Sequence, residues 1–224
     1  NRVETLMFSD GSSIDLTDPN LKLSYYANNE GERIYATDGD DILSGGNGND
    51  TLVALDGEDK ISGGKGNDIL SGGLGDDTYI FSKGDGVKLI SEFGAPVGVN
   101  NADLDRSKLP FDSGGWSWGN TPGNYATNYS VDTIEFALGI KEEDLTFAQN
   151  GSDLIIGIKD SPSDLIVIKD HFFYTTQQIE NLKFFSQSLD ENGQLVTTEQ
   201  VVSLINKDWS QVTMELNGTN NADE

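Results

Sequence analysis

The chain has 224 residues, with 14 Lys and Arg against 38 Asp and Glu, so its formal net charge at pH 7 is -24. This charge repels nucleic acids and anionic membranes and requires cations, so we expect neither nucleic-acid binding nor membrane insertion. The absence of cysteine excludes disulfide bonds and thiolate metal sites, and no apolar run approaches the roughly 18 residues of a membrane-spanning helix.

The first 35 residues predict short β-strands. Residues 3–8 are strand-like and meet a turn at Asp10-Gly11, and further strands are expected at 21–26 and 33–35. The opening segment also echoes residues 179–185 of the same chain. We therefore expect residues 1–35 to be a β segment that resembles the tail of a preceding unit.

Five consecutive nonapeptides then cover residues 36–80 and fit G-G-x-G-x-D-x-U-x, where U is apolar. The phase does not slip, so three positions recur in every repeat. The fourth-position glycines are Gly39, Gly48, Gly57, Gly66 and Gly75. The sixth-position aspartates are Asp41, Asp50, Asp59, Asp68 and Asp77. The apolar eighth positions are Leu43, Leu52, Ile61, Leu70 and Tyr79.

Each position of the repeat has a physical reason. Glycine adopts positive φ and turns the backbone tightly with its carbonyls exposed, aspartate adds an anionic oxygen, and the apolar residue of a short strand points inward. Each nonapeptide is therefore predicted to form half a coil of a parallel β-roll. Because every available ligand is oxygen, the pattern favours calcium over zinc, and carbonyl-rich turns favour it over magnesium.

This stretch resembles the RTX (repeats in toxin) family of calcium-binding repeats. The resemblance implies that several Ca²⁺ ions lie between turns of alternate repeats, held by backbone carbonyls and by two sixth-position aspartates. On this chain it pairs Asp41 with Asp59, Asp50 with Asp68, and Asp59 with Asp77.

Two repeats depart from the pattern, because Ala36-Thr37 and Ala54-Leu55 replace their paired glycines. We expect calcium sites there to be weaker or differently shaped. Calcium is interpreted as a folding cofactor rather than a catalytic or signalling ion, because a metal-free roll would hold a stack of unpaired carboxylates.

Downstream of the roll the pattern stays β. Strands are predicted at 78–81, 87–93, 131–136, 145–148, 154–158, 165–168 and 179–185. A turn is expected at Asn150-Gly151, and Thr197 with Gln200 predicts a capping box for a short helix over 201–205.

This region resembles the hemolysin-type calcium-binding associated domain that follows RTX rolls. The matching segments are 75–81, 83–86, 131–136, 143–147, 152–156 and 179–184. The predicted fold is all-β: a calcium-bound parallel β-roll joined to antiparallel sheet or sandwich elements, with one short C-terminal helix. We expect a roll at 36–80, a β-rich ligand-binding region at 81–216 and the start of a following repeat at 217–224.

An insertion at 94–130 does not belong to that scaffold. It carries Phe111, Trp116, Trp118, Tyr125 and Tyr129 among Gly, Asn, Pro and Asp residues. Aromatic side chains supply contact area at low entropic cost, and loops longer than about 15 residues in a compact domain are usually functional or disordered. The composition indicates a binding loop, and the alternative is a self-packed loop that covers the sheet.

Acidic residues in the insertion leave two further interpretations open. Asn101, Asp103, Asp105 and Asp112 have the oxygen spacing of an EF-hand loop, but Arg106 stands where that loop needs glycine. An irregular calcium site, with one coordination position open to a ligand, is one interpretation. A solvated acidic turn is the other.

The leading functional hypothesis is adhesion. The roll with its aromatic insertion resembles the peptide-binding domain of large bacterial RTX adhesins, which implies an extracellular, cell-surface, monomeric module that acts in cell adhesion and biofilm formation. Its ligand would be the free C-terminus of a peptide or protein on a host or neighbouring cell. From composition, the ligand-binding residues are expected to be Asp103, Asp105, Asp112, Trp116, Trp118, Tyr125, Asn128 and Tyr129.

Three alternatives are weighed against this hypothesis. A calcium-dependent carbohydrate-binding module would use calcium for paired hydroxyls and Trp faces for sugar rings, and a structural spacer would need only the roll. A serine hydrolase would use Ser117 in Gly115-Trp116-Ser117-Trp118-Gly119 and the only histidine, His171. The Gly- and Pro-rich flanks of Ser117 do not fit a nucleophile elbow, so we expect no enzyme activity and a structural role for His171.

Overall fold

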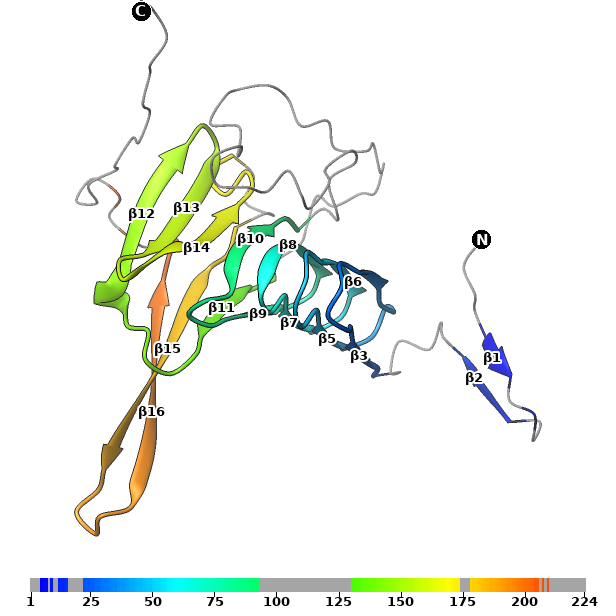
Figure 1. The fold of residues 1–224 in the computed structure, drawn as a ribbon, viewed down its shortest axis with the longest axis horizontal. Helices are drawn as coiled ribbons and strands as arrows, with labels where there is room; N and C mark the ends of the chain where they lie inside the picture. Colours follow the sequence, from blue (N-terminus) through cyan, green and yellow to red (C-terminus); the bar gives the residue numbers. More distant parts are fainter. Residues whose placement is uncertain are drawn as a thin grey trace, which may run out of the picture.

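The computed structural model describes residues 5–7, 9, 12–15, 22–92, 130–173, 178–205, 207 and 209. The regular structure in these residues is nearly all β (Figure 1). A short 3-10 helix, η2 (Glu142–Asp144), precedes one strand, and within the described ranges no helix is long and apolar enough to span a membrane. A separate two-stranded sheet pairs β1 (Thr5–Met7) with β2 (Ser13–Asp15).

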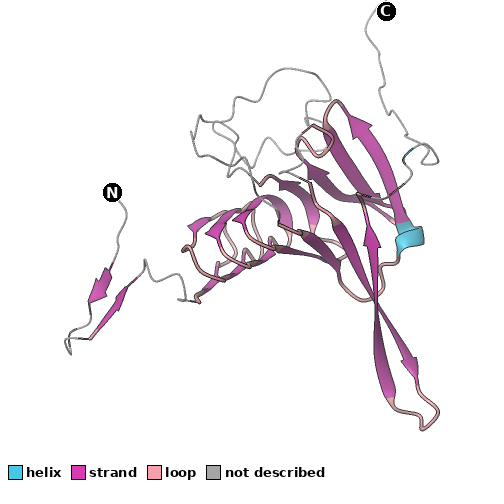
Figure 2. Ribbon diagram, turned by 180° about the vertical axis from the view of Figure 1, so that it is seen from behind, coloured by secondary structure: helices cyan, strands magenta, loops and turns pink. Residues whose placement is uncertain are grey.

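The roll consists of short strands that alternate between two facing sheets as the chain advances (Figure 2). One sheet receives β3 (Ser24–Tyr26), β5 (Ile42–Ser44), β7 (Lys60–Ser62) and β9 (Thr78–Phe81). The other receives β4 (Arg33–Tyr35), β6 (Thr51–Asp56), β8 (Gly66–Leu74) and β10 (Gly86–Ile90). Neighbouring strands in each sheet are parallel, as the nonapeptide period predicts.

The apolar eighth positions stack inward along both sheets. In one ladder Leu43 lies beside Ile61 and Ile61 beside Tyr79, and in the other Leu52 lies beside Leu70. All five side chains are at most 2% exposed. Burial of one such side chain contributes roughly 1.5–3 kcal/mol, so these two stacks form the core of the roll.

The parallel ladder begins one coil before the nonapeptides. β3 pairs with β5 and β4 with β6, so Tyr25 and Ile34 extend the two apolar stacks toward the N-terminus. Counting back nine residues from Asp41 reaches Glu32, an acidic residue in the phase of the sixth-position aspartates. The roll geometry therefore includes residues that the nonapeptide pattern alone does not mark.

Both sheets also continue beyond the last nonapeptide. The added strands are β11 (Thr133–Phe136), β12 (Leu145–Asn150), β13 (Asp153–Ile158), β14 (Ser161–Ile168), β15 (Asn181–Leu189) and β16 (Leu195–Ser203). The sheet orders are β12-β13-β14-β10-β8-β6-β4 and β16-β15-β11-β9-β7-β5-β3. β11, β14 and β15 join in parallel, whereas β12, β13 and β16 join antiparallel.

The predicted fold class is confirmed: a parallel roll leads into antiparallel strands, and one core runs through both parts. Phe136 of β11 links the two parts. Its ring packs edge-on against Phe81 and stacks on Phe184, with ring centroids 6.1 and 5.1 Å apart. Every strand predicted from the sequence overlaps an observed strand, and the predicted Asn150-Gly151 turn connects β12 to β13.

The prediction of a short helix over 201–205 is wrong. These residues belong largely to β16, in which Thr197 pairs with Gln187 and Gln200 with Phe184. The β-branched residues of this segment favour an extended backbone, and the edge of β15 offers a full row of hydrogen-bonding groups. Strand pairing therefore outweighs the capping pattern, and β15 with β16 projects as a long arm (Figure 1).

Glycine in the calcium-binding turns should be far less replaceable than glycine elsewhere. Gly66 has φ +134, and a Cβ there would overlap the carbonyl oxygen of Gly48 in the preceding coil. We expect Gly66→Ala to lower the free energy of unfolding in calcium by about 3 kcal/mol or more, measured by denaturant titration. The control is Gly139→Ala, which has φ +94 but open space around its Cβ and should cost about 1 kcal/mol. Equal losses would contradict the close-approach explanation.

Candidate metal centres

The sixth-position aspartates form two columns that run along the roll. The backbone N–H of Asp41 donates to Oδ1 of Asp59 at 2.6 Å, and that of Asp59 donates to Oδ1 of Asp77 at 2.9 Å. In the other column the N–H of Asp50 donates to Oδ1 of Asp68 at 2.8 Å. The structure therefore brings together each of the three aspartate pairs that the sequence predicted.

The second carboxylate oxygen of these aspartates is the atom available to bind a cation. Asp59 and Asp77 are 2% and 1% exposed, and their Oδ2 atoms are buried without a hydrogen-bond partner in the described part of the chain. Burial raises the pKa of Asp59 to about 7. An anionic oxygen in such surroundings is stable only beside a cation, and hard oxygen donors of this kind fit calcium.

The glycines give the aspartates their space. The carboxylates of Asp68 and Asp77 lie so close to Gly63 and Gly72, at the first positions of their turns, that a Cβ would overlap them. Four of the five fourth-position glycines have the positive φ that favours glycine: Gly48, Gly57, Gly66 and Gly75. Gly39 does not. The repeat thus keeps side chains out of the turn except for the carboxylate.

The two turns without paired glycines depart from the repeat in different ways. Thr37 donates from its N–H and from its hydroxyl to Oδ2 of Asp41, at 2.8 and 2.7 Å. Since Oδ1 of Asp41 accepts from the N–H of Leu23 at 2.7 Å, both oxygens of Asp41 have donors inside the protein. Leu55 keeps the positive φ of a glycine, at 89°, because β6 pairs it with Gly73.

A lysine ends the Asp50–Asp68 column. Lys88 lies beside Asp68 in the ladder, where a further sixth-position carboxylate would be expected, and it is 1% exposed. Its Nζ lies 2.9 Å from Oδ2 of Asp68 and donates to the carbonyl oxygens of Gly66 and Asp85. Backbone carbonyls and aspartate carboxylates are ligands that calcium prefers. The Lys88 ammonium therefore occupies a set of oxygen atoms of the kind that would otherwise surround a calcium ion.

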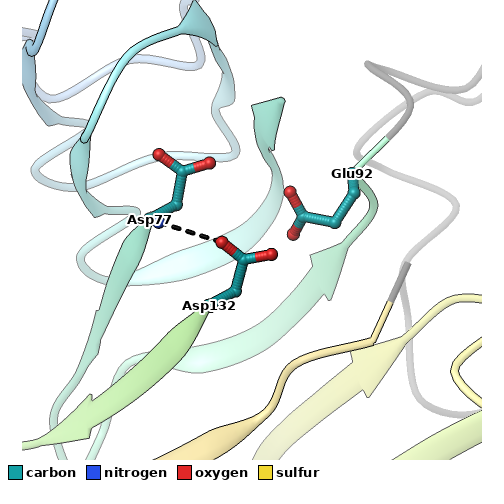
Figure 3. Close-up of side chains that lie close together, drawn as sticks. All are labelled: Asp77, Glu92 and Asp132. Atoms are coloured by element: carbon teal, nitrogen blue, oxygen red, sulfur yellow. Dashed lines mark hydrogen bonds between the residues drawn. The ribbon is translucent and has the colours of Figure 1, made fainter. Parts of the chain in front are cut away.

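The Asp41–Asp59–Asp77 column continues past the repeats. The N–H of Asp77 donates to Oδ1 of Asp132 at 2.9 Å, and the N–H of Asp132 donates to Glu180 at 2.7 Å. Glu92 lies beside this end of the column (Figure 3). The nonapeptide pattern does not mark Lys88, Glu92, Asp132 or Glu180 as site residues. A signal existed for Asp132, since residues 132–136 (DTIEF) repeat the D-T-x-x-F pattern of residues 77–81 (DTYIF).

The predicted ligand-binding residues lie outside the described residues, as does Ser117: Asp103, Asp105, Asp112, Trp116, Trp118, Tyr125, Asn128 and Tyr129. His171 is 2% exposed and packs edge-on against Phe172 and Trp209 at 5.0 and 6.3 Å. Burial lowers the pKa of His171 to about 4, so the ring is neutral at physiological pH. It has the structural surroundings that the sequence predicted.

Removing the Lys88 ammonium should destabilise the calcium-loaded protein. Lys88→Met leaves the buried Asp68 carboxylate without its counter-charge, so we expect the free energy of unfolding to fall by about 3 kcal/mol, measured by denaturant titration. The control is Lys60→Met, since Lys60 is half exposed and its Nζ lies 4.0 Å from Glu135. That substitution should cost less than about 1 kcal/mol. Similar losses for both variants would contradict a structural role for the ammonium.

The metal-free protein should lose stability as the pH rises. Burial raises the pKa of Asp59 and Glu180 to about 7 and that of Asp68 to about 6, so between about pH 4 and pH 7 the folded state holds more protons than the unfolded state. In chelator we therefore expect a higher Tm at about pH 5 than at about pH 8, measured by circular dichroism. Calcium should stabilise more at the higher pH, because it binds the deprotonated carboxylates. A chelated protein that is more stable at the higher pH would contradict this assignment.

Two comparisons with protein families match parts of the chain. The RTX calcium-binding nonapeptide repeat matches residues 26–61, 44–79 and 53–87, and the haemolysin-type calcium binding protein related domain matches residues 153–186. No curated protein matches the chain. The chain therefore carries an RTX calcium-binding repeat module, which binds Ca²⁺ at several sites, followed by a segment related to haemolysin-type calcium-binding proteins.

Proposed function

We propose that this chain is a calcium-dependent ligand-binding module of an extracellular bacterial adhesin, and that it binds the free C-terminal end of a peptide or protein on another cell. The observation that carries the proposal is the place where the 94–130 insertion joins the roll. The insertion begins just after β10 and ends just before β11, within a turn of the calcium-binding coil. RTX repeats are typical of secreted proteins, which agrees with an extracellular role.

The strand register defines this place. Leu70 pairs with Ile90, which puts Glu92 across from Gly72, and Thr78 pairs with Thr133, which puts Asp132 across from Asp77. In the preceding coil four residues, 73–76, connect Gly72 to Asp77, whereas 39 residues of sequence, 93–131, separate Glu92 from Asp132. The insertion therefore falls in the sequence at one turn of the roll, between a strand of one sheet and a strand of the other.

The composition of the insertion supports ligand binding. Trp116, Trp118, Tyr125 and Tyr129 lie within fourteen residues of sequence, among Gly, Asn and Ser. Large rigid aromatic side chains flanked by small polar ones are the composition of protein segments that bind peptides and sugars. A purely structural turn needs no such residues.

The charge of the chain makes calcium part of the recognition. A net charge of -24 repels a free carboxylate, so a peptide C-terminus requires a cation or a row of backbone donors at its binding site. Calcium also folds the roll on which the insertion is mounted. Ligand binding is therefore proposed to depend on calcium twice, through the scaffold and through the charge.

The experiment presents the calcium-loaded protein with a peptide library of random C-termini, in free-acid and amidated forms, and repeats the free-acid set in chelator. We expect enrichment of free-acid peptides in calcium only. For a selected peptide, Trp116→Ala with Trp118→Ala should weaken binding about tenfold or more, measured by calorimetry. The matched control is Tyr26→Ala, an aromatic residue of the roll that is 74% exposed, which should leave Kd within about twofold.

Two outcomes would overturn the peptide proposal. Equal enrichment of amidated and free-acid peptides would show that the terminal carboxylate is not recognised. No enrichment at all would direct the same protein to a glycan array, where calcium-dependent binding would support a carbohydrate-binding module instead. Absence of binding on both arrays would leave the structural-spacer hypothesis.

A further inference from the structure

Three acidic side chains converge at the end of the first column. Asp77, Glu92 and Asp132 each offer a carboxylate oxygen, and these oxygens lie within 4.8 Å of one another (Figure 3). Asp77 and Asp132 are 1% exposed and Glu92 is 5% exposed, so water does not screen the cluster. In the described part of the chain none of the three forms an ion pair with a lysine or arginine.

The hydrogen bonds of the cluster leave one oxygen without a donor. Glu92 accepts from the Tyr79 hydroxyl at 2.6 Å and from the N–H of Gly73 at 3.2 Å. Asp132 accepts from the N–H of Asp77, and Oδ1 of Asp77 accepts from the preceding coil. Oδ2 of Asp77 is buried and has no hydrogen-bond partner among the described residues. Figure 3 shows the Asp77 carboxylate on the same side of the roll as those of Glu92 and Asp132, and one oxygen of each lies within 4.8 Å of the others.

The Asp50–Asp68 column shows how a buried carboxylate at the end of a column is compensated. There the last aspartate, Asp68, faces the Lys88 ammonium at 2.9 Å, so a cation of the chain itself compensates the terminal carboxylate. In the Asp41–Asp59–Asp77 column the residue across from Asp77 is Asp132, a carboxylate in place of a lysine, and Glu92 adds a third carboxylate beside them. The same electrostatic requirement, with more negative charge and no cationic side chain, needs a cation from solution.

We infer that Asp77, Glu92 and Asp132 bind a calcium ion outside the nonapeptide repeats, and that this ion joins the two ends of the inserted segment to the roll. Glu92 and Asp132 flank residues 93–131, and Asp77 belongs to the last nonapeptide. All the ligand atoms are carboxylate oxygens, which calcium prefers and zinc does not. Glu92 lies beside Gly73, so its side chain supplies an oxygen at the turn that the insertion interrupts.

The protonation behaviour of the cluster agrees with this site. Burial raises the pKa of Asp77, and the nearby Glu92 and Asp132 add to the rise. Burial also raises the pKa of Asp132 and of Glu92. A bound cation would lower these raised pKa values, so calcium binding at this site should release protons. The site itself does not depend on the proposed ligand, and only its consequence for the inserted segment rests on the proposed function.

The test counts calcium ions bound to the full chain, by equilibrium dialysis with metal analysis, without any peptide. Glu92→Gln keeps the shape of the side chain and one oxygen that can accept from the Gly73 N–H, and it removes the negative charge. Asp132→Asn likewise keeps the acceptor for the Asp77 N–H. We expect each variant to bind one ion fewer than the wild-type protein.

The matched control is Asp164→Asn. Asp164 is also buried, at 1% exposure, but its two oxygens accept from the N–H groups of Gly84 and Gly86 at 2.7 and 3.0 Å. This variant removes a buried carboxylate outside both columns, and it should bind as many ions as the wild-type protein.

A terbium titration provides a second measurement on the wild-type protein and on any folded variant. Terbium replaces calcium, and the Tyr79 hydroxyl contacts Glu92, so terbium in this site should give tyrosine-sensitised luminescence that Glu92→Gln diminishes and Asp164→Asn preserves. An unchanged ion count and unchanged luminescence in Glu92→Gln and Asp132→Asn would overturn the inference. Because no peptide is present, failure of the peptide-binding proposal would leave this result unaffected.

Discussion

The structure depends on the stacking of buried carboxylates along the roll. One oxygen of Asp59, of Asp68 and of Asp77 accepts the N–H of the aspartate in the preceding coil, which fixes the distance between coils. The same stacking places negative charges one above another in surroundings that exclude water. Hydrogen bonds alone cannot compensate several such charges, so the geometry that aligns the coils also obliges them to bind cations.

This requirement explains why glycine and aspartate occur together in the repeat. The Asp77 carboxylate can turn inward beside Gly72 only because Gly72 has no Cβ. The strand that follows Asp77 is buried, so its burial requires that the charge of this carboxylate be compensated. Apolar burial at positions such as Leu43 and Ile61 then adds the favourable free energy of an ordinary core. The cations and the core are therefore not independent contributions, because each coil needs both.

The sequence was sufficient to predict the roll, because its period places one inward apolar residue and one carboxylate in every repeat. Periodicity could not reveal interactions that occur once. Lys88 stands alone in the pattern, and Glu92 and Asp132 are separated by the insertion, so only strand pairing brings them to Asp77. The helix predicted near Gln200 failed for a related reason, since the capping pattern is local and the partner strand that overrides it is not.

The two ends of the carboxylate columns differ in a way that bears on function. Lys88 gives one column a cation that is part of the chain, so the Asp68 carboxylate at its end has a counter-charge without an ion from solution. In the other column Asp77 lies beside Asp132 and Glu92, the two residues that flank the insertion, and there the charge is left to an ion from solution. Calcium would therefore act most directly on the coil that carries the proposed binding segment.

Tying the ends of a long segment lowers the conformational entropy that ligand binding must still overcome. If calcium in the Asp77–Glu92–Asp132 cluster favours ligand binding in this way, thermodynamic linkage requires the ligand to raise the affinity of that site for calcium by the same factor. The linkage would be strongest at this site, because pairs such as Asp50 with Asp68 lie within coils that contain no insertion. Such a module would hold its terminal calcium most firmly when it is bound to its ligand, so adhesion and the completion of the fold would reinforce each other.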